Sequence, residues 1–289
     1  MSSGRWYPGC GDTIRVVGDP GLFGPDSITW RVNREGVLLL GGGAALILQV
    51  AHPLVGAGVA EHSNYREDPW GRLYRTLDLT TKIVFGSTEE AHEASQRIRN
   101  VHKRVQGVTK EDGGKHPAGT PYSANDPELG MWVHATLVDT SMRVYSAYVG
   151  TLSHAQELRY YEEQKRLGEM FGVPIEEQPE TLADFRAYFD RMVEEELAVT
   201  AALTDVVSAT LRPELPFVAR PLVEAINLAT ASLLPASLRR DLGLELGTSR
   251  KRLVSASRAV IRRALPVLPR LLRDFPPARS ADRRVAAAA

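Results

Sequence analysis

Signals for the start of an α-helix recur along this chain, and they constrain its fold more than any other feature. Ser87 and Ser153 each stand three residues before a glutamate or glutamine, the spacing of a capping box. Asp126 followed by Pro127 is a strong N-cap and first-turn pair, and Thr181 opens a segment with apolar residues at helical spacing. No series of alternating apolar residues predicts a set of strands. We therefore expect an all-α protein of roughly nine to eleven helices.

The length of 289 residues suits one large domain with less regular ends. We expect an N-terminal arm over residues 1–33, a helical domain over 34–265 and a basic tail over 266–289. The tail is rich in proline, arginine and alanine, a composition typical of loosely held and partly disordered segments.

The net charge excludes few classes of partner, but charged residues are unevenly distributed along the chain. Lysine plus arginine and aspartate plus glutamate number 35 each, so the net charge does not favour a nucleic-acid partner. From Arg250 onward, 11 basic residues stand against 2 acidic ones, a net of 11 − 2 = +9. Such an end is either solvated or touches a polyanion, which could be a nucleic acid or, by peripheral contact, an anionic membrane. The oligomeric state stays open.

Cys10 is the only cysteine, so the chain can form neither an internal disulfide nor a cysteine-based zinc site. Residues 1–11 lack the charged and apolar pattern of a signal peptide. A reducing compartment, by default the cytoplasm, is the expected location.

An apolar run over residues 37–59 contains the glycine triplet 41–43 and is interrupted by Pro53. Its length approaches the ~20 residues that a bilayer requires. The glycines and the proline favour instead a buried helix that is kinked or ended at Pro53. Glycines destabilise a helix by about 1 kcal/mol each, so they point to close helix packing or to a flat ligand lying against them. The triplet lacks the spacing of a dinucleotide-binding motif.

The two ends of a predicted helical hairpin over residues 72–107 carry chemically useful side chains. Arg72, Arg75 and Thr76 lie within one helical turn, and two neighbouring guanidinium groups can hold a carboxylate. At the other end, His102 borders an apolar stripe and can point inward. A solvated arginine face and a hydrogen-bonded core histidine are the simpler alternatives.

No histidine or glutamate stands at metal-cage spacing from His102 on its helix, which disfavours a dedicated non-haem metal site there. One histidine is enough for haem, whose iron needs a single protein ligand on its proximal side. His134, on the helix that begins after Asp126, is a second histidine that can be buried. Helical periodicity alone does not decide whether these two histidines belong to a buried binding site or to an ordinary core.

A series of short motifs carries a resemblance. In chain order they are Glu35-Gly36, Leu48-Gln49-Val50-Ala51-His52-Pro53, Glu61-His62-Ser63, Asp68-Pro69, Arg72-Leu73-Tyr74-Arg75-Thr76, Val84-Phe85-Gly86, Arg99-Asn100-Val101-His102, Val105-Gln106-Gly107, Tyr122-Ser123-Ala124-Asn125-Asp126-Pro127 and Trp132-Val133-His134-Ala135-Thr136-Leu137. In this order they resemble the MpaB and latex-clearing-protein type oxygenases, over residues 34–244.

The resemblance implies an all-helical, globin-like fold with one haem b, which uses dioxygen to cleave carbon–carbon double bonds in isoprenoid chains. By motif, His102 would bind the iron. Arg99, one turn before it, would pair with a haem propionate. His134 and His52 are further candidates for contact with the cofactor. The substrate would be an apolar small molecule, held in a pocket lined by residues 41–59.

The same resemblance puts Arg72, Arg75 and Thr76 on the distal side of the haem, with Glu61 as the nearest candidate for a catalytic base and His62 as a similar candidate. Rubber-cleaving members carry a lysine where this chain has Arg75, and that lysine can bind the iron. Arginine stays protonated and offers no lone pair. A five-coordinate or water-bound resting haem is therefore expected.

Three alternatives remain compatible with the residues. A haem or lipid carrier would share the pocket and His102 without catalysing oxidation. A haem enzyme with a distal arginine can also use peroxide in place of dioxygen. A helical interaction module without a cofactor would dock through its basic tail.

Overall fold

The computed structural model describes residues 18–63, 65–212 and 216–287. Cys10 and residues 1–11, on which the expected location rests, lie outside this part. Within it the chain forms 14 α-helices and one two-stranded sheet, so the all-α class is confirmed, with more helices than expected. Short helices and a break in the long apolar run account for part of the difference.

The bounds of the helices are as follows: α1 Ile28–Asn33, α2 Gly42–Ala51, α3 Pro53–His62, α4 Pro69–Phe85, α5 Thr88–His102, α6 Pro127–Val144, α7 His154–Phe171, α8 Leu182–Glu195, α9 Ala201–Leu211, α10 Arg220–Leu233, α11 Ala236–Asp241, α12 Thr248–Ala264, α13 Arg270–Arg273 and α14 Pro276–Ala286. Short stretches of other helix types occur at Gly36–Gly41, Tyr145–Val149, Ile175–Glu177, Phe217–Ala219 and Leu265–Val267. Strands β1 (Gln106–Val108) and β2 (Pro121–Ser123) pair antiparallel.

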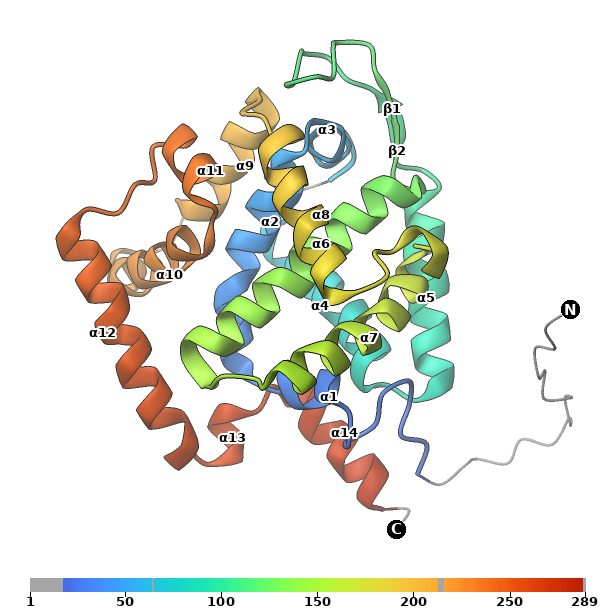
Figure 1. The fold of residues 1–289 in the computed structure, drawn as a ribbon, viewed down its shortest axis with the longest axis vertical. Helices are drawn as coiled ribbons and strands as arrows, with labels where there is room; N and C mark the ends of the chain where they lie inside the picture. The colour runs from blue at the N-terminus through green and yellow to red at the C-terminus, as the bar shows by residue number, and fades with distance from the viewer. Residues whose placement is uncertain (1–17, 64, 213–215, 288–289) are drawn as a thin grey trace, which may run out of the picture.

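Helix α6 runs through the middle of the molecule, with α2, α7 and α8 packed against it (Figure 1). Trp132 of α6 is fully buried and donates a hydrogen bond from Nε1 to the carbonyl oxygen of Leu48 at 3.1 Å. A second apolar cluster contains Trp30 and Phe85, whose rings meet edge to face at 5.1 Å. The segment expected to be an N-terminal arm therefore contributes Trp30 to the interior.

The apolar run over residues 37–59 is broken where the sequence predicts. Helix α2 ends at Ala51, and α3 begins at Pro53, which needs no backbone hydrogen-bond donor in a first turn. Among the described residues, no single helix has the length and hydropathy of a membrane span. Gly36–Ala51 and Pro53–His62 meet those criteria only when combined, and they are bent by 107°.

Close packing explains two of the three glycines at residues 41–43, namely Gly41 and Gly43. A Cβ on Gly41 would lie 2.6 Å from a methyl group of Thr140 on α6, and one on Gly43 would lie 2.7 Å from Oγ1 of Thr230 on α10. These glycines let α6 and α10 approach the start of α2. A flat ligand is not needed to explain Gly41 and Gly43, because neighbouring helices fill the space beside them.

Helices α4 and α5 form a hairpin around a turn at residues 86–87. The side chain of Asp68 caps α4 by accepting a backbone hydrogen bond, and the predicted capping box of Ser87 and Glu90 is present at the start of α5. Helix α5 ends at His102, before the expected residue 107, because the chain then enters β1. The sequence does not predict this sheet, since three-residue strands are too short to show an alternating pattern.

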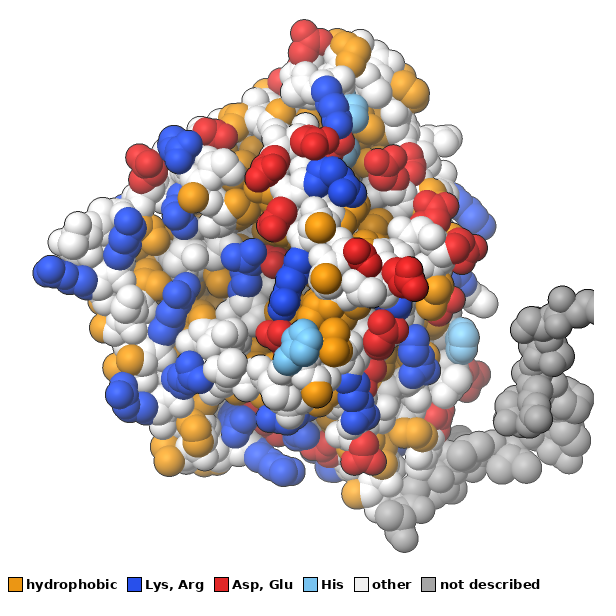
Figure 2. Space-filling model, in the orientation of Figure 1, with side chains coloured by type: hydrophobic (Ala, Val, Ile, Leu, Met, Phe, Trp, Pro, Cys, Tyr) orange, Lys and Arg blue, Asp and Glu red, His pale blue; other side chains and the backbone are white. Residues whose placement is uncertain are grey.

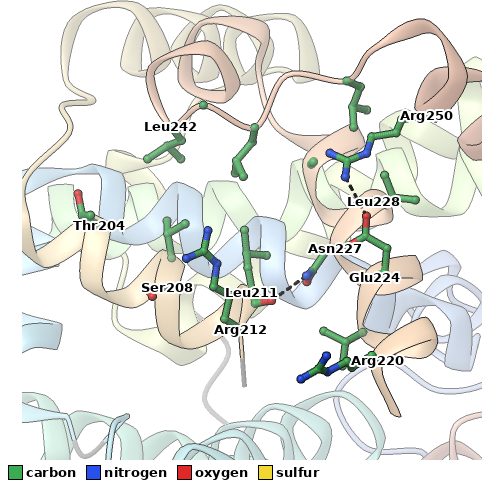
Figure 3. A pocket seen from close by; sticks show the side chains of 16 residues that line it. Thr204, Ser208, Leu211, Arg212, Arg220, Glu224, Asn227, Leu228, Leu242 and Arg250 are labelled. Carbon is green, nitrogen blue, oxygen red and sulfur yellow. Dashed lines mark hydrogen bonds and ion pairs between the residues drawn. The ribbon is translucent and has the colours of Figure 1, made fainter. Parts of the chain in front are cut away.

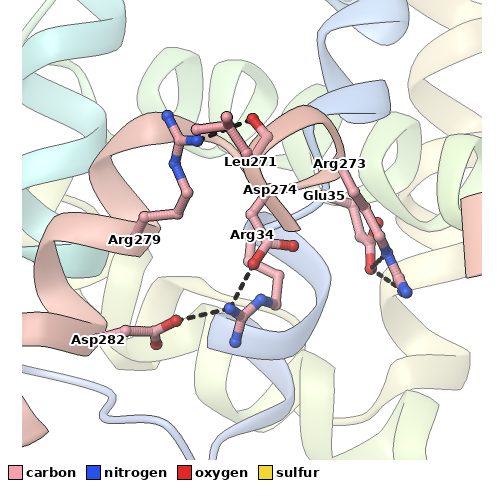
Figure 4. Close-up of polar contacts among 7 residues, drawn as sticks. All are labelled: Arg34, Glu35, Leu271, Arg273, Asp274, Arg279 and Asp282. Atoms are coloured by element: carbon pink, nitrogen blue, oxygen red, sulfur yellow. Dashed lines mark hydrogen bonds and ion pairs between the residues drawn. The ribbon is translucent and has the colours of Figure 1, made fainter. Parts of the chain in front are cut away.

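The C-terminal segment is packed against the bundle, and the expectation of a loosely held tail over residues 266–289 is wrong for its described part. It forms α13 and α14, and α14 joins the second apolar cluster. Arg34 lies 2.6 Å from Asp274 and 2.7 Å from Asp282, and these ion pairs hold the segment near the end of α1 (Figure 4). The composition of this segment predicted disorder because composition does not reveal ion pairs between residues that lie far apart along the chain.

The charge asymmetry of the sequence is visible on the surface. On the face drawn in Figure 2, lysine and arginine side chains gather over the C-terminal helices α10 to α13, and acidic side chains gather on the opposite side. The two sides of this face therefore present different charge to the solvent.

Candidate functional site

The open end of the α4–α5 hairpin, which we call the hairpin end, carries the two predicted parts of the site. Because the helices run back on each other from the turn at residues 86–87, the first turns of α4 and the last turn of α5 lie together. This end brings Arg72 and His102 to one region. The sequence predicts Leu73 and Val101 on inward stripes, but their side chains are 45% and 55% exposed. The hairpin end therefore offers apolar surface beside its polar groups.

His102 is the last residue of α5, and its imidazole is only partly exposed. Burial lowers the pKa of His102, because the charged form loses hydration, and no charged neighbour among the described residues offsets the shift. The ring is therefore neutral at neutral pH. A neutral imidazole keeps a nitrogen lone pair, which is the form that binds a metal.

Arg72 is in a similar environment on α4. Burial lowers the pKa of Arg72, and only Tyr65 opposes the shift, so no carboxylate of the described residues stabilises the guanidinium. Arginine nevertheless stays protonated in proteins. A partly desolvated guanidinium without an acidic partner is stabilised by binding an anion, which it can hold through two parallel hydrogen bonds.

Arg75 and Thr76 are engaged differently. The Nη1 atom of Arg75 lies 3.0 Å from Oδ2 of Asp68, and its side chain is 61% exposed. The exposed hydroxyl of Thr76 donates to the carbonyl oxygen of Arg72 at 3.0 Å. The two arginines therefore do not act as a pair on one ligand in this structure, because Arg75 already has an acidic partner.

Arg99 and His134 lie on helices that meet α7. Arg99 donates to the hydroxyl of Ser95, which in turn donates to the carbonyl oxygen of Met170 at 2.5 Å. His134 is 2% exposed, and its ring lies 6.0 Å from that of Phe171. Burial lowers the pKa of His134 to about 4, against the opposing effect of a backbone hydrogen bond with Gln164.

Glu61 lies in a polar cluster between α3 and the small sheet. It accepts a hydrogen bond from the hydroxyl of Tyr122 and lies 2.7 Å from Nζ of Lys110. The Lys110 and Tyr122 hydrogen bonds hold the pKa of Glu61 below its ordinary value, so the carboxylate is ionised at neutral pH. His62 Nε2 lies 3.3 Å from the same hydroxyl. Lys110 and Tyr122 are functional candidates that the sequence does not reveal, because only the pairing of β1 with β2 places them here.

A groove of about 650 Å³ runs beside this cluster. It is lined by α3, the segment that follows β1, and the start of α9. From the run over residues 41–59, only Pro53 and Ala57 line it. Glu61 and His62 stand at its polar side, so the groove combines small apolar side chains with an ionised carboxylate.

A larger cavity of about 920 Å³ lies elsewhere, between α9, α10 and the segment over residues 242–250 (Figure 3). Arg250 pairs with Glu224 at 3.2 Å across it, and Asn227 donates to the carbonyl oxygen of Leu211 at 2.7 Å. None of the site residues predicted from the sequence lines this cavity. Its size alone therefore does not make it the site.

His52 belongs to a different group from His102. It stands at the bend between α2 and α3, and its Nε2 atom lies 4.0 Å from Oε2 of Glu196. The Nε2 atom of His116 lies 3.0 Å from the same oxygen. Burial, followed by the proximity of His116, lowers the pKa of His52 to about 4. His116 and Glu196 lie far along the chain from His52, so no motif spacing could have connected the three.

Comparison with known proteins gives a family match. Residues 30–263 match the family described as "ER-bound oxygenase mpaB/B'/Rubber oxygenase, catalytic domain". Two relatives are the uncharacterized proteins Mb2261 of Mycobacterium bovis and Rv2237 of Mycobacterium tuberculosis. Each is 26% identical over 234 residues, which cover 78% of this chain and 88% of the relative. No solved structure matches significantly.

Proposed function

On the premise that this chain belongs to the mpaB and rubber oxygenase catalytic-domain family, we propose that it is a haem-dependent oxygenase. Its substrate would be an apolar, isoprenoid-like molecule with a carbon–carbon double bond. Dioxygen would be the oxidant. The observation that carries this proposal is that the hairpin end has a neutral, partly buried His102 and an Arg72 with no acidic partner among the described residues.

The residues of the hairpin end fit a haem b group. His102 offers a neutral imidazole nitrogen, the usual proximal ligand of haem iron. Arg72 offers a partly desolvated guanidinium that suits a propionate carboxylate. Leu73 and Val101 add exposed apolar surface from both helices, which a flat macrocycle could cover.

When bound, haem would supply a redox-active iron at which dioxygen can be activated. The role of His102 is to hold the cofactor through its lone pair. Arg75 remains protonated and paired with Asp68, so it offers no lone pair to a metal. The iron would therefore lack the lysine ligand found in rubber-cleaving relatives.

Glu61 is the group in the neighbouring groove that can hold a proton during the reaction. Its carboxylate is ionised, and the Tyr122 hydroxyl bonds it on one side. Val105, three residues after His102, packs close to Gly58 of α3, so the end of α5 leads directly to the helix that carries Glu61. We assign Pro53 and Ala57 of the groove to contact with the apolar substrate.

An absorption spectrum of the purified protein in oxidised, reduced and carbon monoxide-bound forms tests the cofactor. A haem Soret band that is lost in His102→Ala and retained in His92→Ala, on the exposed side of the same helix, is the expected result. Oxygen consumption with isoprenoid alkenes then tests the reaction. A protein that shows no Soret band after reconstitution with haem would exclude the cofactor. Oxidation with peroxide but not with dioxygen would exclude the oxygenase.

A further inference from the structure

Three side chains with metal-binding atoms converge at the bend between α2 and α3. His52 stands at the bend, His116 in the loop between β1 and β2, and Glu196 at the end of α8. In this part of the molecule the β1–β2 hairpin stands beside α3 (Figure 1). One nitrogen of each histidine and one carboxylate oxygen all lie within 4.8 Å of one another. The group contains no residue of the hairpin end.

His52 is the most constrained member of this group. It is 3% exposed, and its Nδ1 atom has no hydrogen-bond partner among the described residues. Its Nε2 atom faces Glu196 at 4.0 Å, which is too far for a hydrogen bond. A buried nitrogen without a partner is destabilising, and Nε2, which faces Glu196 beyond hydrogen-bond distance, can bind a cation together with the other two side chains.

The distances suit a small cation after a modest adjustment. In a tetrahedral zinc site, bonds of about 2.0–2.1 Å place neighbouring ligand atoms about 3.3 Å apart. His116 Nε2 and Glu196 Oε2 are already 3.0 Å apart. The remaining approach, from 4.0 Å between His52 and Glu196, needs a shift of roughly 1 Å. Rotation of the Glu196 side chain can supply this shift, and movement of the loop residue His116 can shorten the distance between the two histidines, which is at most 4.8 Å.

We propose that His52, His116 and Glu196 bind one divalent transition-metal cation of the zinc class. Two imidazole nitrogens and one carboxylate oxygen form a donor set typical of such ions. The cation would hold the loop over residues 109–120 against the α2–α3 bend and α8. Its site is separate from the haem proposed at His102, so either can be present without the other.

Lys115 does not block this site. Its Nζ atom lies 2.5 Å from Oε1 of Glu196 and leaves Oε2 directed at the two histidines. The lysine is half-exposed and already lies 4.0 Å from Glu195, which can take over the ion pair when a cation binds.

A cation that holds the loop over residues 109–120 in place would also stabilise two contacts that the loop makes. Glu111 accepts hydrogen bonds from the backbone of Ala201 and Ala202 and so caps the start of α9. Gly113 packs so closely on Pro53 that an added Cβ would lie 2.6 Å from the proline ring. Pro53 and Glu111 both line the groove beside Glu61, so the cation would stabilise one wall of the groove.

The test uses the full-length protein, stripped with EDTA and then returned to zinc. We expect elemental analysis to give one zinc per chain, and saturating zinc to raise Tm by roughly 5 °C. His116→Ala should weaken zinc binding by at least about tenfold, and His116→Cys should retain it because thiolate is also a zinc ligand. His92→Ala is the matched control and should bind as the unmodified protein does.

Two further variants separate this site from its alternatives. His102→Ala should retain zinc, which keeps the outcome independent of the haem proposal. Lys115→Gln should bind zinc at least as tightly as the unmodified protein. If the cluster serves only as an ion pair between Lys115 and Glu196, neither the unmodified protein nor Lys115→Gln would bind zinc. Equal zinc affinity for the unmodified protein and His116→Ala, with no change in Tm, would overturn the proposal.

Discussion

Arg273 holds the buried carboxylate of Glu35 through two contacts, 2.9 Å from Nε to Oε2 and 2.5 Å from Nη2 to Oε1. Glu35 is 3% exposed, and Arg273 comes from α13, near the C-terminal end of the described chain (Figure 4). This pair joins the loop after α1 to the segment that composition predicts to be loose. The C-terminal segment is therefore part of the folded domain.

Replacing Arg273 by alanine should destabilise the whole domain. The change leaves the Glu35 carboxylate buried without a partner, a situation that costs several kcal/mol for fully buried pairs. Because Arg273 is partly exposed, we expect a loss of about 2–3 kcal/mol in the free energy of unfolding. Urea unfolding measures it. Arg279→Ala is the control, since Arg279 is partly exposed and bonds only the carbonyl oxygen of Leu271 among the described residues, and it should lose less than about 0.5 kcal/mol.

Arg72 and Arg75 should contribute unequally to haem binding. Arg72 has no acidic partner in the described part of the chain and would bind a propionate, whereas Arg75 is already paired with Asp68. A charge-assisted hydrogen bond is worth about 1.5–3 kcal/mol, so Arg72→Leu should weaken haem affinity by roughly 10- to 100-fold. Arg75→Leu should change it by less than about threefold. Haem titration followed at the Soret band measures both, and equal losses would contradict the assignment of Arg72.

His134 should make the protein less stable in acid. Burial lowers the pKa of its imidazole to about 4 in the folded state, against about 6.5 in an unfolded chain. Protonation therefore favours the unfolded state. The contribution of His134 to the free energy of unfolding is therefore fully present above about pH 6.5. It falls by about 3 kcal/mol in total as the pH drops toward 4.

Urea unfolding at a series of pH values tests this linkage. His134→Gln should lower stability at pH 7 but flatten the decline between about pH 6.5 and 4. His154→Gln removes an exposed histidine from the start of α7 and should leave the decline unchanged. A decline of the same slope in His134→Gln would show that another group is responsible.

Local signals in the sequence predicted helix starts well, and contacts between distant segments explain what these signals missed. The capping box of Ser87 and the proline after Asp126 fix helix starts through bonds within a few residues. The docking of the C-terminal segment depends on Arg34, whose partners lie at the other end of the chain. No local pattern encodes that pairing.

The candidate site shows the same division. The sequence predicts His102 on a helix expected to reach residue 107, and the short turn between α4 and α5 puts it at the same end of the hairpin as Arg72. Helical periodicity failed for Leu73 and Val101, since a stripe is buried only as far as neighbouring helices extend over it. The grouping of His52 with His116 required three separate elements to meet, so it could not be read from spacing.

The start of α2 offers a sharp test of packing with adjacent residues. A Cβ at Gly41 would lie 2.6 Å from Thr140 and 2.9 Å from Val144, both on α6. Overpacking of this kind costs about 1–3 kcal/mol, so Gly41→Ala should lower the free energy of unfolding by that amount. No described atom lies within 4 Å of the position that a Cβ on Gly42 would take, and Gly42 begins α2, so Gly42→Ala should stabilise by up to about 1 kcal/mol. Urea unfolding of the two variants compares them directly, and the same sign for both would show that helix propensity, and not contact with α6, governs this segment.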